Sequence, residues 1–438
     1  MAAALPTPYR PVIADTGTAL REPPRNTPVW AEVDVAVIGG GAAGIGAAVA
    51  AARAGAQKVL LIERYGFCGG AAVAGMSGTI CGLFASGTGS PEIITRGFSR
   101  EFHERLHRRG GVAEPWPFGR TYLAVHDPLA WKELADDYLL DHRVGVLYHT
   151  LMVDAVVRDR RVTYALVENK NGRGAVTARA WIDASGDADL IARAGGPSTF
   201  GRAGVVQAPT MIFRMMNVDV ARAALTSPEE LQQKLKAAQQ SGRFRLPRLH
   251  CYMYPSPRAG EYSCNMTRVN PPPESGKPCL SGIDTDDLTY GEFEGRKLVR
   301  EYERFLREEV RGFETAVVND CGTQLGIRQT RTVVGRTMLT NQDVMQARKF
   351  GAEAISRSAW PIEDHSAGEV RIVYLDRDYY EIPRQALVPA TLDNVWVAGR
   401  CFSAEHEALA SARVTAQCLE MGGAAGRMAV ESLFQRSS

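Results

Sequence analysis

The sequence predicts an α/β fold in which one domain is built on a parallel sheet and a second, α+β domain is inserted into it. Two observations lead to this prediction. Between Val33 and Gly70, short apolar runs bounded by glycines alternate with an alanine-rich helical run, as buried parallel strands and their crossover helix do. From Phe200, methionines, aromatic residues and prolines increase, and a strand followed by a small-residue helix returns after Tyr380.

The domain boundaries are predicted from these changes in composition. We expect an extended N-terminal arm over residues 1–30 and the first part of the parallel-sheet domain over 31–199. An inserted substrate or cap domain then covers roughly 200–380, and the C-terminal part of the first domain covers 381–438. A chain of 438 residues is long enough for two domains intertwined in this way.

Composition argues against several kinds of partner. Hydrophobic content of 45% and charged content of 23% are those of an ordinary soluble globular protein. A net charge of +2 gives no reason to expect nucleic acid or an anionic membrane surface as partner. No apolar run reaches the roughly 18 residues of a membrane span. The eight cysteines form neither C-x-x-C nor a ligand group with histidine, so we expect no metal and a reducing, cytoplasmic location.

The first thirty residues predict an arm rather than a targeting segment. They contain six prolines, and the apolar stretches between the prolines are too short for the core of a signal peptide. We expect the arm either to be free or to lie across a neighbouring subunit. It is therefore a candidate contact in a homo-oligomer.

The stretch from Val33 to Glu63 carries the strongest motif of the chain. The strand expected over Val33–Ile38 runs into a G-x-G-x-x-G turn formed by Gly39, Gly41 and Gly44. In a Rossmann-like domain the first glycine makes the tight turn, the second lets backbone approach a pyrophosphate, and the third lets the helix pack on the strand. The turn, with Ala42 and Ala43, is thus predicted to bind a dinucleotide at the helix N-terminus.

The acid that follows narrows the choice of dinucleotide. A helix over Ala47–Ala54 ends at Gly55, and a second strand over Lys58–Ile62 delivers Glu63 about 24 residues after Gly39. A carboxylate here suits free ribose hydroxyls, so FAD or NAD is favoured over NADP. A glycine-rich turn in an ordinary α/β domain is the alternative reading.

After the second strand the sequence continues as Glu63-Arg64-Tyr65-Gly66-Phe67-Cys68-Gly69-Gly70. This stretch resembles the corresponding sequence of the FAD-dependent oxidoreductases that have the glutathione-reductase (GR2) type of FAD-binding domain. Within them it is similar to the bacterial FAD_oxidored group, which reads much like LLIERYGFxGG here and is distantly like the fumarate reductase flavoproteins. The resemblance implies FAD as cofactor. It also implies that the loop after the acid runs along FAD, so Arg64, Cys68, Gly69 and Gly70 are expected against it.

The next segments extend the same resemblance. Helices are expected over 97–109 and 129–140, the second capped by Asp127, and strands over 144–148, 151–157, 162–168 and 175–182. The last strand ends in a string that resembles the Ala-Thr-Gly signature of the family. This implies cofactor contacts from Val153 and its neighbour Met152 near the adenine, and from Ala184, Ser185 and Gly186.

Further likenesses cover the rest of the chain. Helices are expected over 227–240 and 290–311. The segments 326–335, 360–365 and 380–383 have close counterparts in the family, which places His365 near the active site by resemblance. A strand over 394–398 and a helix over 412–434 resemble the C-terminal flavin motif, NLLVAGRxxSAxHxAxxSxR. This motif implies cofactor contacts from Gly399, Arg400 and Val414, with Arg400 at the pyrophosphate and Arg413 near flavin N1, where charge collects on reduction.

The catalytic residues are predicted with more alternatives open. FAD takes hydride at N5, and the protein orients substrate and supplies an acid or base. The candidates are His406, His365, His126 and Tyr379, with His406 preferred because the loop before Ser411 must pass the flavin. A structural hydrogen bond is the alternative role for His406. Cys68 could attach flavin covalently, but a small buried hydrophobic role is favoured for it and for Cys401.

We therefore expect an FAD-dependent dehydrogenase or oxidase that takes hydride from a small organic substrate. No second glycine turn follows a strand, so a separate nicotinamide domain is not expected. A reductase or monooxygenase with an external electron donor is one alternative, and a non-redox lyase, isomerase or hydratase is another. The sequence names no substrate class, although four arginines could each anchor an acid: Arg214, Arg245, Arg258 and Arg384.

Overall fold

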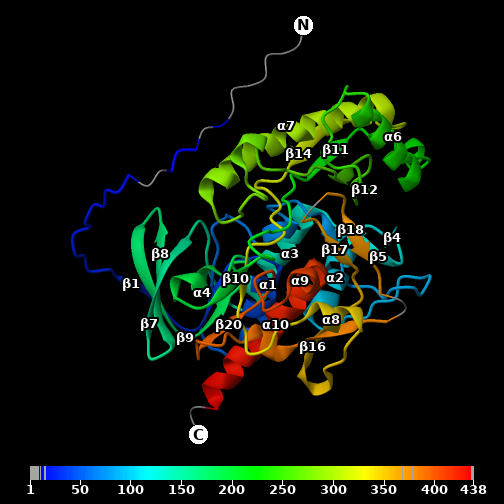
Figure 1. The fold of residues 1–438 in the computed structure, drawn as a ribbon. Helices are drawn as coiled ribbons and strands as arrows, with labels where there is room; N and C mark the ends of the chain where they lie inside the picture. The colour runs from blue at the N-terminus through cyan, green and yellow to red at the C-terminus, as the bar shows by residue number, and fades with distance from the viewer. Residues whose placement is uncertain (1–8, 10, 14–15, 367, 376–377, 436–438) are drawn as a thin grey trace.

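The computed structural model describes residues 9, 11–13, 16–366, 368–375 and 378–435. Figure 1 shows two bodies, a larger one that holds both ends of the sheet domain and a smaller one above it that carries α6 and α7. The helices are α1 (Ala42–Arg53), α2 (Phe98–Arg108), α3 (Pro128–Asp141), α4 (Asp189–Arg193), α5 (Val220–Ala223), α6 (Pro228–Gln240), α7 (Thr285–Glu309), α8 (Asn341–Met345), α9 (His406–Ala412) and α10 (Thr415–Phe434).

The strands fall into one large sheet and several small ones. The large sheet contains β1 (Val29–Ile38), β2 (Val59–Ile62), β6 (Gly145–Leu147), β7 (Leu151–Arg158), β8 (Arg161–Asn169), β9 (Gly172–Asp183) and β20 (Val395–Val397). The small sheets contain β3 (Thr79–Ile80), β4 (Trp116–Phe118), β5 (Thr121–Val125), β10 (Ser198–Phe200), β11 (Phe213–Met216), β12 (Tyr252–Pro255), β13 (Tyr262–Asn265), β14 (Val317–Cys321), β15 (Arg331–Val333), β16 (Ala354–Ser358), β17 (Ile362–Asp364), β18 (Arg371–Val373) and β19 (Tyr380–Pro383).

The large sheet confirms the predicted parallel core. Its order is β6-β2-β1-β9, all parallel, and β20 from the C-terminal segment pairs in parallel with the end of β9. The start of β9 pairs instead with β8, which pairs with β7, and both pairings are antiparallel. Buried apolar residues fill β2 and the last four positions of β1. One strand, β9, thus joins the parallel sheet to the antiparallel strands.

Helices α1 and α10 pack against each other with almost no side chain between them. A Cβ at Gly422 would lie 2.0 Å from the carbonyl oxygen of Ala43, and one at Gly426 would lie 2.4 Å from that of Ala47. A Cβ at Gly46 would lie 2.6 Å from the carbonyl oxygen of Leu419. The small residues of both helices therefore allow backbone to meet backbone.

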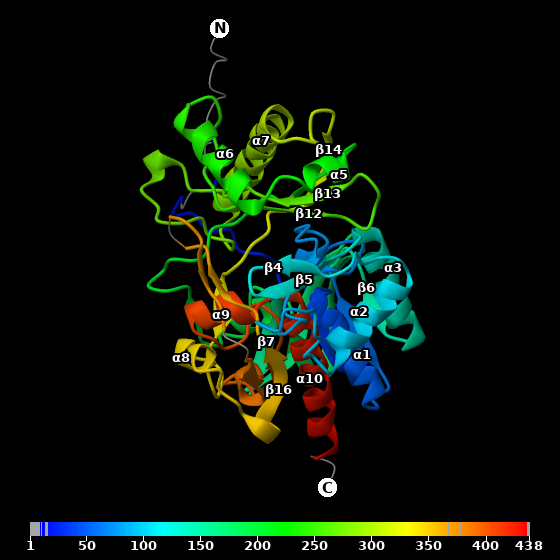
Figure 2. The ribbon, with the colours of Figure 1, turned by 90° about the vertical axis from the view of Figure 1, so that its right-hand side faces the viewer.

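The inserted body has its own hydrophobic core. Its buried residues run from Met211 to Leu325 and gather between α6, α7 and the sheet β12-β13-β11-β14. Figure 2 shows β12 and β13 on the side of this body that faces β4 and β5. The core of the insertion ends near residue 327, whereas the sequence placed the substrate domain to about residue 380. Val333, Ile362 and Tyr380 belong to the core of the large body instead, because β15 to β19 pack there.

Two arginines of the insertion bind the large body. Arg214 lies in a buried ion pair with Glu261, at 2.5 Å, and donates to the carbonyl oxygen of His126, at 2.8 Å. Arg258 donates to Asp127, whose carboxylate also caps α3 by accepting from the amides of residues 129 and 130. The predicted cap at Asp127 is confirmed, and the same carboxylate also binds the inserted domain.

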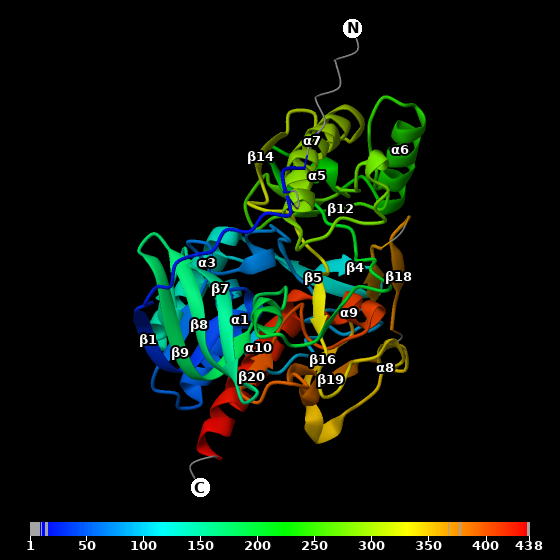
Figure 3. The same cartoon turned by 60° about the vertical axis from the view of Figure 1, so that its left-hand side comes forward.

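The N-terminal arm contacts its own chain at Tyr9, Val12 and Ile13, whereas residues 16–26 are exposed. The carboxylate of Asp286, in the first turn of α7, accepts from the Tyr9 hydroxyl and from the amides of Val12 and Ile13. Figure 3 shows the arm passing from this point down to β1. Residues 1–8, 10 and 14–15 of the predicted arm lie outside the described residues, and the oligomer that the arm suggested stays a prediction. None of the helices described is both long and apolar enough to cross a membrane.

The C-terminal helix differs from its prediction. The sequence predicts one helix over 412–434, but the chain forms α9, leaves the helical conformation at Val414, and begins again as α10. Val414 has extended backbone, with φ −73° and ψ 163°. The break gives α10 its own N-terminus, next to Arg413.

Glycine 422 provides a test of the helix contact. Because an alanine Cβ there would overlap Ala43, we expect G422A to lower the free energy of unfolding by about 1–3 kcal/mol, as overpacking does. G423A is the matched control, since its Cβ would come no closer than 3.5 Å, to Arg427 Nη1, and alanine favours the helix. Urea unfolding followed by circular dichroism measures both variants. Equal stability of the two would contradict the close contact.

Candidate cofactor site

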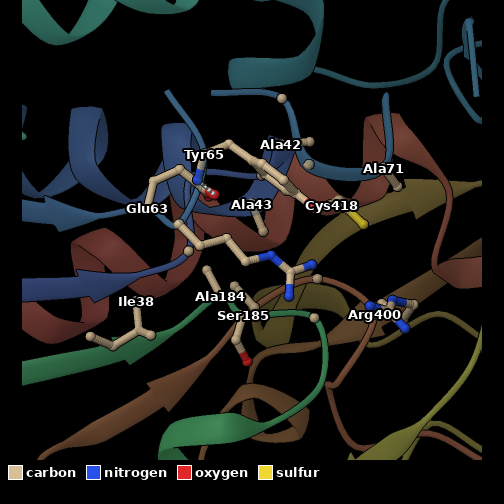
Figure 4. A pocket seen from close by; sticks show the side chains of 18 of the residues that line it. Ile38, Ala42, Ala43, Glu63, Tyr65, Ala71, Ala184, Ser185, Arg400 and Cys418 are labelled. Atoms are coloured by element: carbon tan, nitrogen blue, oxygen red, sulfur yellow. Dashed lines mark hydrogen bonds between the residues drawn. The ribbon is translucent and has the colours of Figure 1, made fainter. Parts of the chain in front are cut away.

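One cavity crosses the large body along the carboxyl ends of the parallel strands. Figure 4 shows its lining from the β1 turn (Ala42, Ala43), the end of β2 (Glu63, Tyr65), the end of β9 (Ala184, Ser185) and Arg400 after β20. Ligands of open α/β sheets bind at this edge. Segments that are far apart in sequence therefore meet at one site.

The glycine turn opens this cavity toward a helix end. A Cβ at Gly39 would lie 2.6 Å from the carbonyl oxygen of Ala184, and one at Gly44 would lie 1.8 Å from that of Gly39, so both positions exclude a side chain. Gly41 lines the cavity and is the N-cap of α1, where no side chain caps the helix among the described residues. The first amides of α1 are thus available to an anion.

Glu63 is buried, and its carboxylate organises the turn. Its Oε2 accepts from the amide of Gly40 at 2.6 Å, and its Oε1 accepts from the amide of Tyr65 at 2.8 Å. Glu63 also lines the cavity, so it can accept from ribose hydroxyls through its remaining lone pairs. One side chain ties the end of β2 to the β1 turn.

The loop after β9 is held by Asp183. Its Oδ1 accepts from the amide and hydroxyl of Ser185, and its Oδ2 accepts from the amide of Ile191. Arg400 reaches the same loop, where its Nη2 lies 2.9 Å from Asp187 Oδ1. The other guanidinium nitrogen, Nη1, is buried and has no partner among the described residues, so it can donate to a bound anion.

The far end of the cavity is formed by the second helix terminus and by the insertion. Arg413, Thr415 and Cys418 line it from the α9–α10 break, and no side chain caps α10 in the described structure. Gln324 and Ile327 line it from the end of the insertion. Gln324 Oε1 accepts from the Tyr65 hydroxyl and from Arg64, so the insertion is bound to the loop after β2.

Most of the predicted cofactor residues line this cavity: Gly39, Gly41, Ala42, Ala43, Glu63, Arg64, Gly69, Gly70, Ala184, Ser185, Gly186, Gly399 and Arg400. Four predicted residues do not line it, although a direct neighbour of each does: Gly44, Cys68, Val153 and Val414. Other residues line the cavity although the sequence did not predict them, among them Thr150, Leu151, Asp189, Gln324, Ile327, Thr415 and Cys418. They belong to loops, to the start of β7 and to the first turns of α4 and α10, whose place depends on the tertiary fold.

Cys68 lies behind the glycine turn. It has no exposed surface, and burial raises the pKa of its thiol to about 12. A Cβ at Gly40 would lie 2.7 Å from its Sγ, so the sulfur fills the space under the turn. These contacts favour the small hydrophobic role over attachment to a cofactor.

The two preferred histidines are buried and lie outside the lining of the cavity. His365 Nε2 lies 3.3 Å from Glu363 Oε1, and His406 Nε2 lies 3.4 Å from Asp364 Oδ1. Burial lowers the pKa of His365 well below its ordinary value, so it is neutral. His406 begins α9, which ends beside the cavity-lining Arg413, and the charge of Asp364 reaches Arg413. Both carboxylates are neighbours on β17.

The other candidates have structural surroundings. His126 is fully buried against Trp131, with ring centroids 4.7 Å apart, and burial lowers its pKa to about 3. Tyr379 packs under Lys349 and does not line the cavity. The four arginines considered as acid anchors already pair with carboxylates, namely Arg214 with Glu261, Arg245 with Glu294, Arg258 with Asp127 and Arg384 with Glu431.

The contacts of Glu63 predict its effect on cofactor affinity. E63Q loses the charge that strengthens two hydrogen bonds to backbone amides, and a charged hydrogen bond contributes about 1.5–3 kcal/mol. We expect E63Q to weaken FAD binding by about tenfold to a hundredfold. E32Q, on the exposed face of β1, is the matched control. Fluorescence titration of the apoprotein with FAD measures both, and unchanged affinity in E63Q would contradict this role.

Comparison with known proteins agrees with this architecture. Residues 34–437 match the family model of FAD dependent oxidoreductases. A geranylgeranyl bacteriochlorophyll reductase-like protein from Thermoplasma acidophilum is 14% identical, with 93% of this chain and 80% of that chain covered and a TM-score of 0.50. That likeness shows the shared fold alone.

Two further solved structures are similar at lower scores. The flavin-dependent brominase Bmp2 is 14% identical over 92% of this chain and 79% of that chain, with a TM-score of 0.44. The p-nitrophenol 4-monooxygenase PnpA from Pseudomonas putida DLL-E4 is 12% identical over 69% of each chain, with a TM-score of 0.40. No curated protein sequence matches the chain.

The cavity suits the cofactor of this family. Its glycine-lined floor leaves room for backbone to contact a diphosphate, and two helices begin at it without a side-chain cap in the part of the chain described. Because the family model matches residues 34–437, the chain belongs to the FAD dependent oxidoreductase family and is an FAD-dependent enzyme.

Proposed function

We propose that the protein is a dehydrogenase or oxidase that takes hydride from a small organic substrate. The observation that carries the proposal is the pair of buried histidine–carboxylate contacts beside the cavity-lining Arg413, formed by β17 and α9. Oxidation of an alcohol or amine releases a proton as hydride leaves, so it needs a proton acceptor at this place. Bound FAD would supply the hydride acceptor, at flavin N5.

The residues of the cavity have separate roles in this proposal. The α1 amides after Gly41 and the free Nη1 of Arg400 bind the diphosphate. Glu63 binds the adenosine ribose, and the 150–152 turn contacts the adenine. The start of α10, with Arg413, faces the flavin edge where negative charge collects. These contacts use backbone and side-chain donors, and the acceptor oxygens of Glu63, that the fold leaves available.

His406 is the proposed proton acceptor. Its Nε2 faces Asp364, which fixes the ring, and its Nδ1 is buried without a partner among the described residues. An oriented ring with one free nitrogen is the arrangement that a general base requires. His365 is the second candidate: its Nε2 lies 3.3 Å from Glu363 Oε1, and burial and the charge of Arg328 lower its pKa, although the contact with Glu363 raises it.

Anaerobic reduction distinguishes the proposed reaction from its alternatives. We expect a compound among small alcohols, amines and hydroxy acids to bleach the flavin of the purified protein without air and without NADH or NADPH. A protein that is bleached only by a nicotinamide cofactor would be a reductase or monooxygenase. A protein that turns over substrate without bleaching would be a non-redox enzyme. Either result would overturn the proposal.

Substitution of His406 tests its role. We expect H406Q to slow flavin reduction by about 10²- to 10⁴-fold, the range for loss of a general base, with FAD binding unchanged. H107Q, on the exposed face of α2, is the control. Stopped-flow reduction and FAD titration measure the two quantities. Normal reduction in H406Q, with slowing in H365Q, would move the assignment to His365.

A further inference from the structure

A cluster of arginines lies between the insertion and the large body. Asn265 Oδ1, at the end of β13, accepts from Arg248 at 2.9 Å and from Arg328 at 3.5 Å. Arg328 also donates to the carbonyl oxygen of Ala208, and the neighbouring Gln207 accepts from Arg413 at 2.8 Å. Hydrogen bonds, together with the peptide bond between Gln207 and Ala208, thus connect three guanidinium groups, the last of which lines the cofactor cavity.

Positive charge exceeds negative charge in this cluster. Arg248 and Arg328 are 4% and 9% exposed, and Arg268, partly buried, is close enough to affect the pKa of Arg328. The carboxylates whose charges act on this group are Glu363, Asp364 and the exposed Glu369, so four guanidinium groups meet three carboxylates. The neighbouring charges and hydrogen bonds, foremost the contact with His365, offset burial and lower the pKa of Glu363 to about 2.

Several buried donors around this cluster are unused. Four side-chain groups are buried without a hydrogen-bond partner among the described residues: Arg248 Nη2, Arg413 Nε, Gln207 Nε2 and the Tyr252 hydroxyl. A buried donor without a partner destabilises the fold, and more so when it is charged. Four of them in one place, together with excess positive charge, indicate that an anion completes the site.

An aromatic wall adjoins the arginines. Tyr252 stacks on Tyr254 with ring centroids 6.2 Å apart, and Phe118 stacks on Trp360 at 4.8 Å. Phe118 and Tyr252 also touch, at 5.0 Å, so residues of the insertion and of the large body share this cluster. The guanidinium of Arg248 lies 5.7 Å from the Tyr252 ring centre. The charged and apolar parts of the place are therefore contiguous.

We propose that this place is the substrate subsite and that it binds an organic acid, whose carboxylate meets Arg248 and Arg328 while its apolar body lies against the aromatic wall. Nε and Nη1 of Arg248 already donate to the carbonyl oxygen of His250 and to Asn265, so its free Nη2 is the nitrogen that can donate a charged hydrogen bond to the carboxylate. The inference rests on the proposed oxidation, because the cluster adjoins the flavin end of the cavity through Arg413.

Benzoate and benzamide test the ligand class on the FAD-loaded wild-type protein. The two share a ring and differ in charge, so we expect benzoate to perturb the flavin spectrum and tryptophan fluorescence with a Kd at least about tenfold below that of benzamide. Equal binding of both, or no benzoate binding at millimolar concentration, would overturn the inference. Binding is measured without turnover. Selective benzoate binding by a protein whose flavin no substrate reduces would leave the subsite standing and reject the proposed reaction.

Variants locate the carboxylate. We expect R248Q and R328Q each to raise the Kd for benzoate by about tenfold to a hundredfold, the effect of losing a charged hydrogen bond, with little change for benzamide. R243Q is the control, since Arg243 pairs with Glu308 on the exposed surface of α7. R248K retains the charge in case R248Q does not fold, and we expect it to bind benzoate between wild type and R248Q. Wild-type affinity in folded R248K and R328Q would contradict the site.

Discussion

The direct backbone contact between α1 and α10 is the constraint on which the rest of the structure depends. Gly422 and Gly426 let α10 reach the carbonyl groups of α1, so residues 379 positions apart lie against each other. Helix α10 begins at the cofactor cavity, after the break at Val414. Since α1 begins at the same cavity, the packing of the two helices directs both N-termini toward one ligand.

The cavity depends both on polar groups that are hydrogen-bonded within the protein and on polar groups that have no partner there. The carboxylates of Glu63 and Asp183 accept hydrogen bonds from backbone amides, and these bonds fix the turns after β2 and β9. Arg400 uses one nitrogen on Asp187 and keeps another free. Buried donors without partners are costly, so their concentration beside a glycine-lined cavity indicates places that a ligand completes.

The arginines of the inserted domain divide into two groups by their partners. Arg214 and Arg258 are satisfied by carboxylates and join the insertion to the loop at residues 126–127. Arg248 and Arg328 meet instead at Asn265, between the two bodies. Arg214 and Arg258 therefore position the insertion against the large body. Arg248 and Arg328 form the positively charged group between the two bodies.

The sequence by itself determined the glycine turn, the acid Glu63, the α/β alternation and the family. These features depend on the local spacing of residues and on glycines at positions where a side chain would not fit. Thirteen of the predicted cofactor residues line one cavity for that reason. Only the tertiary structure decided the break before α10, the end of the inserted core near residue 327, and which arginines keep free donors. Whether an arginine forms an ion pair depends on which side chains lie near it in space. The sequence does not distinguish Arg214 from Arg248, but in the folded protein Arg214 pairs with a carboxylate and Arg248 does not.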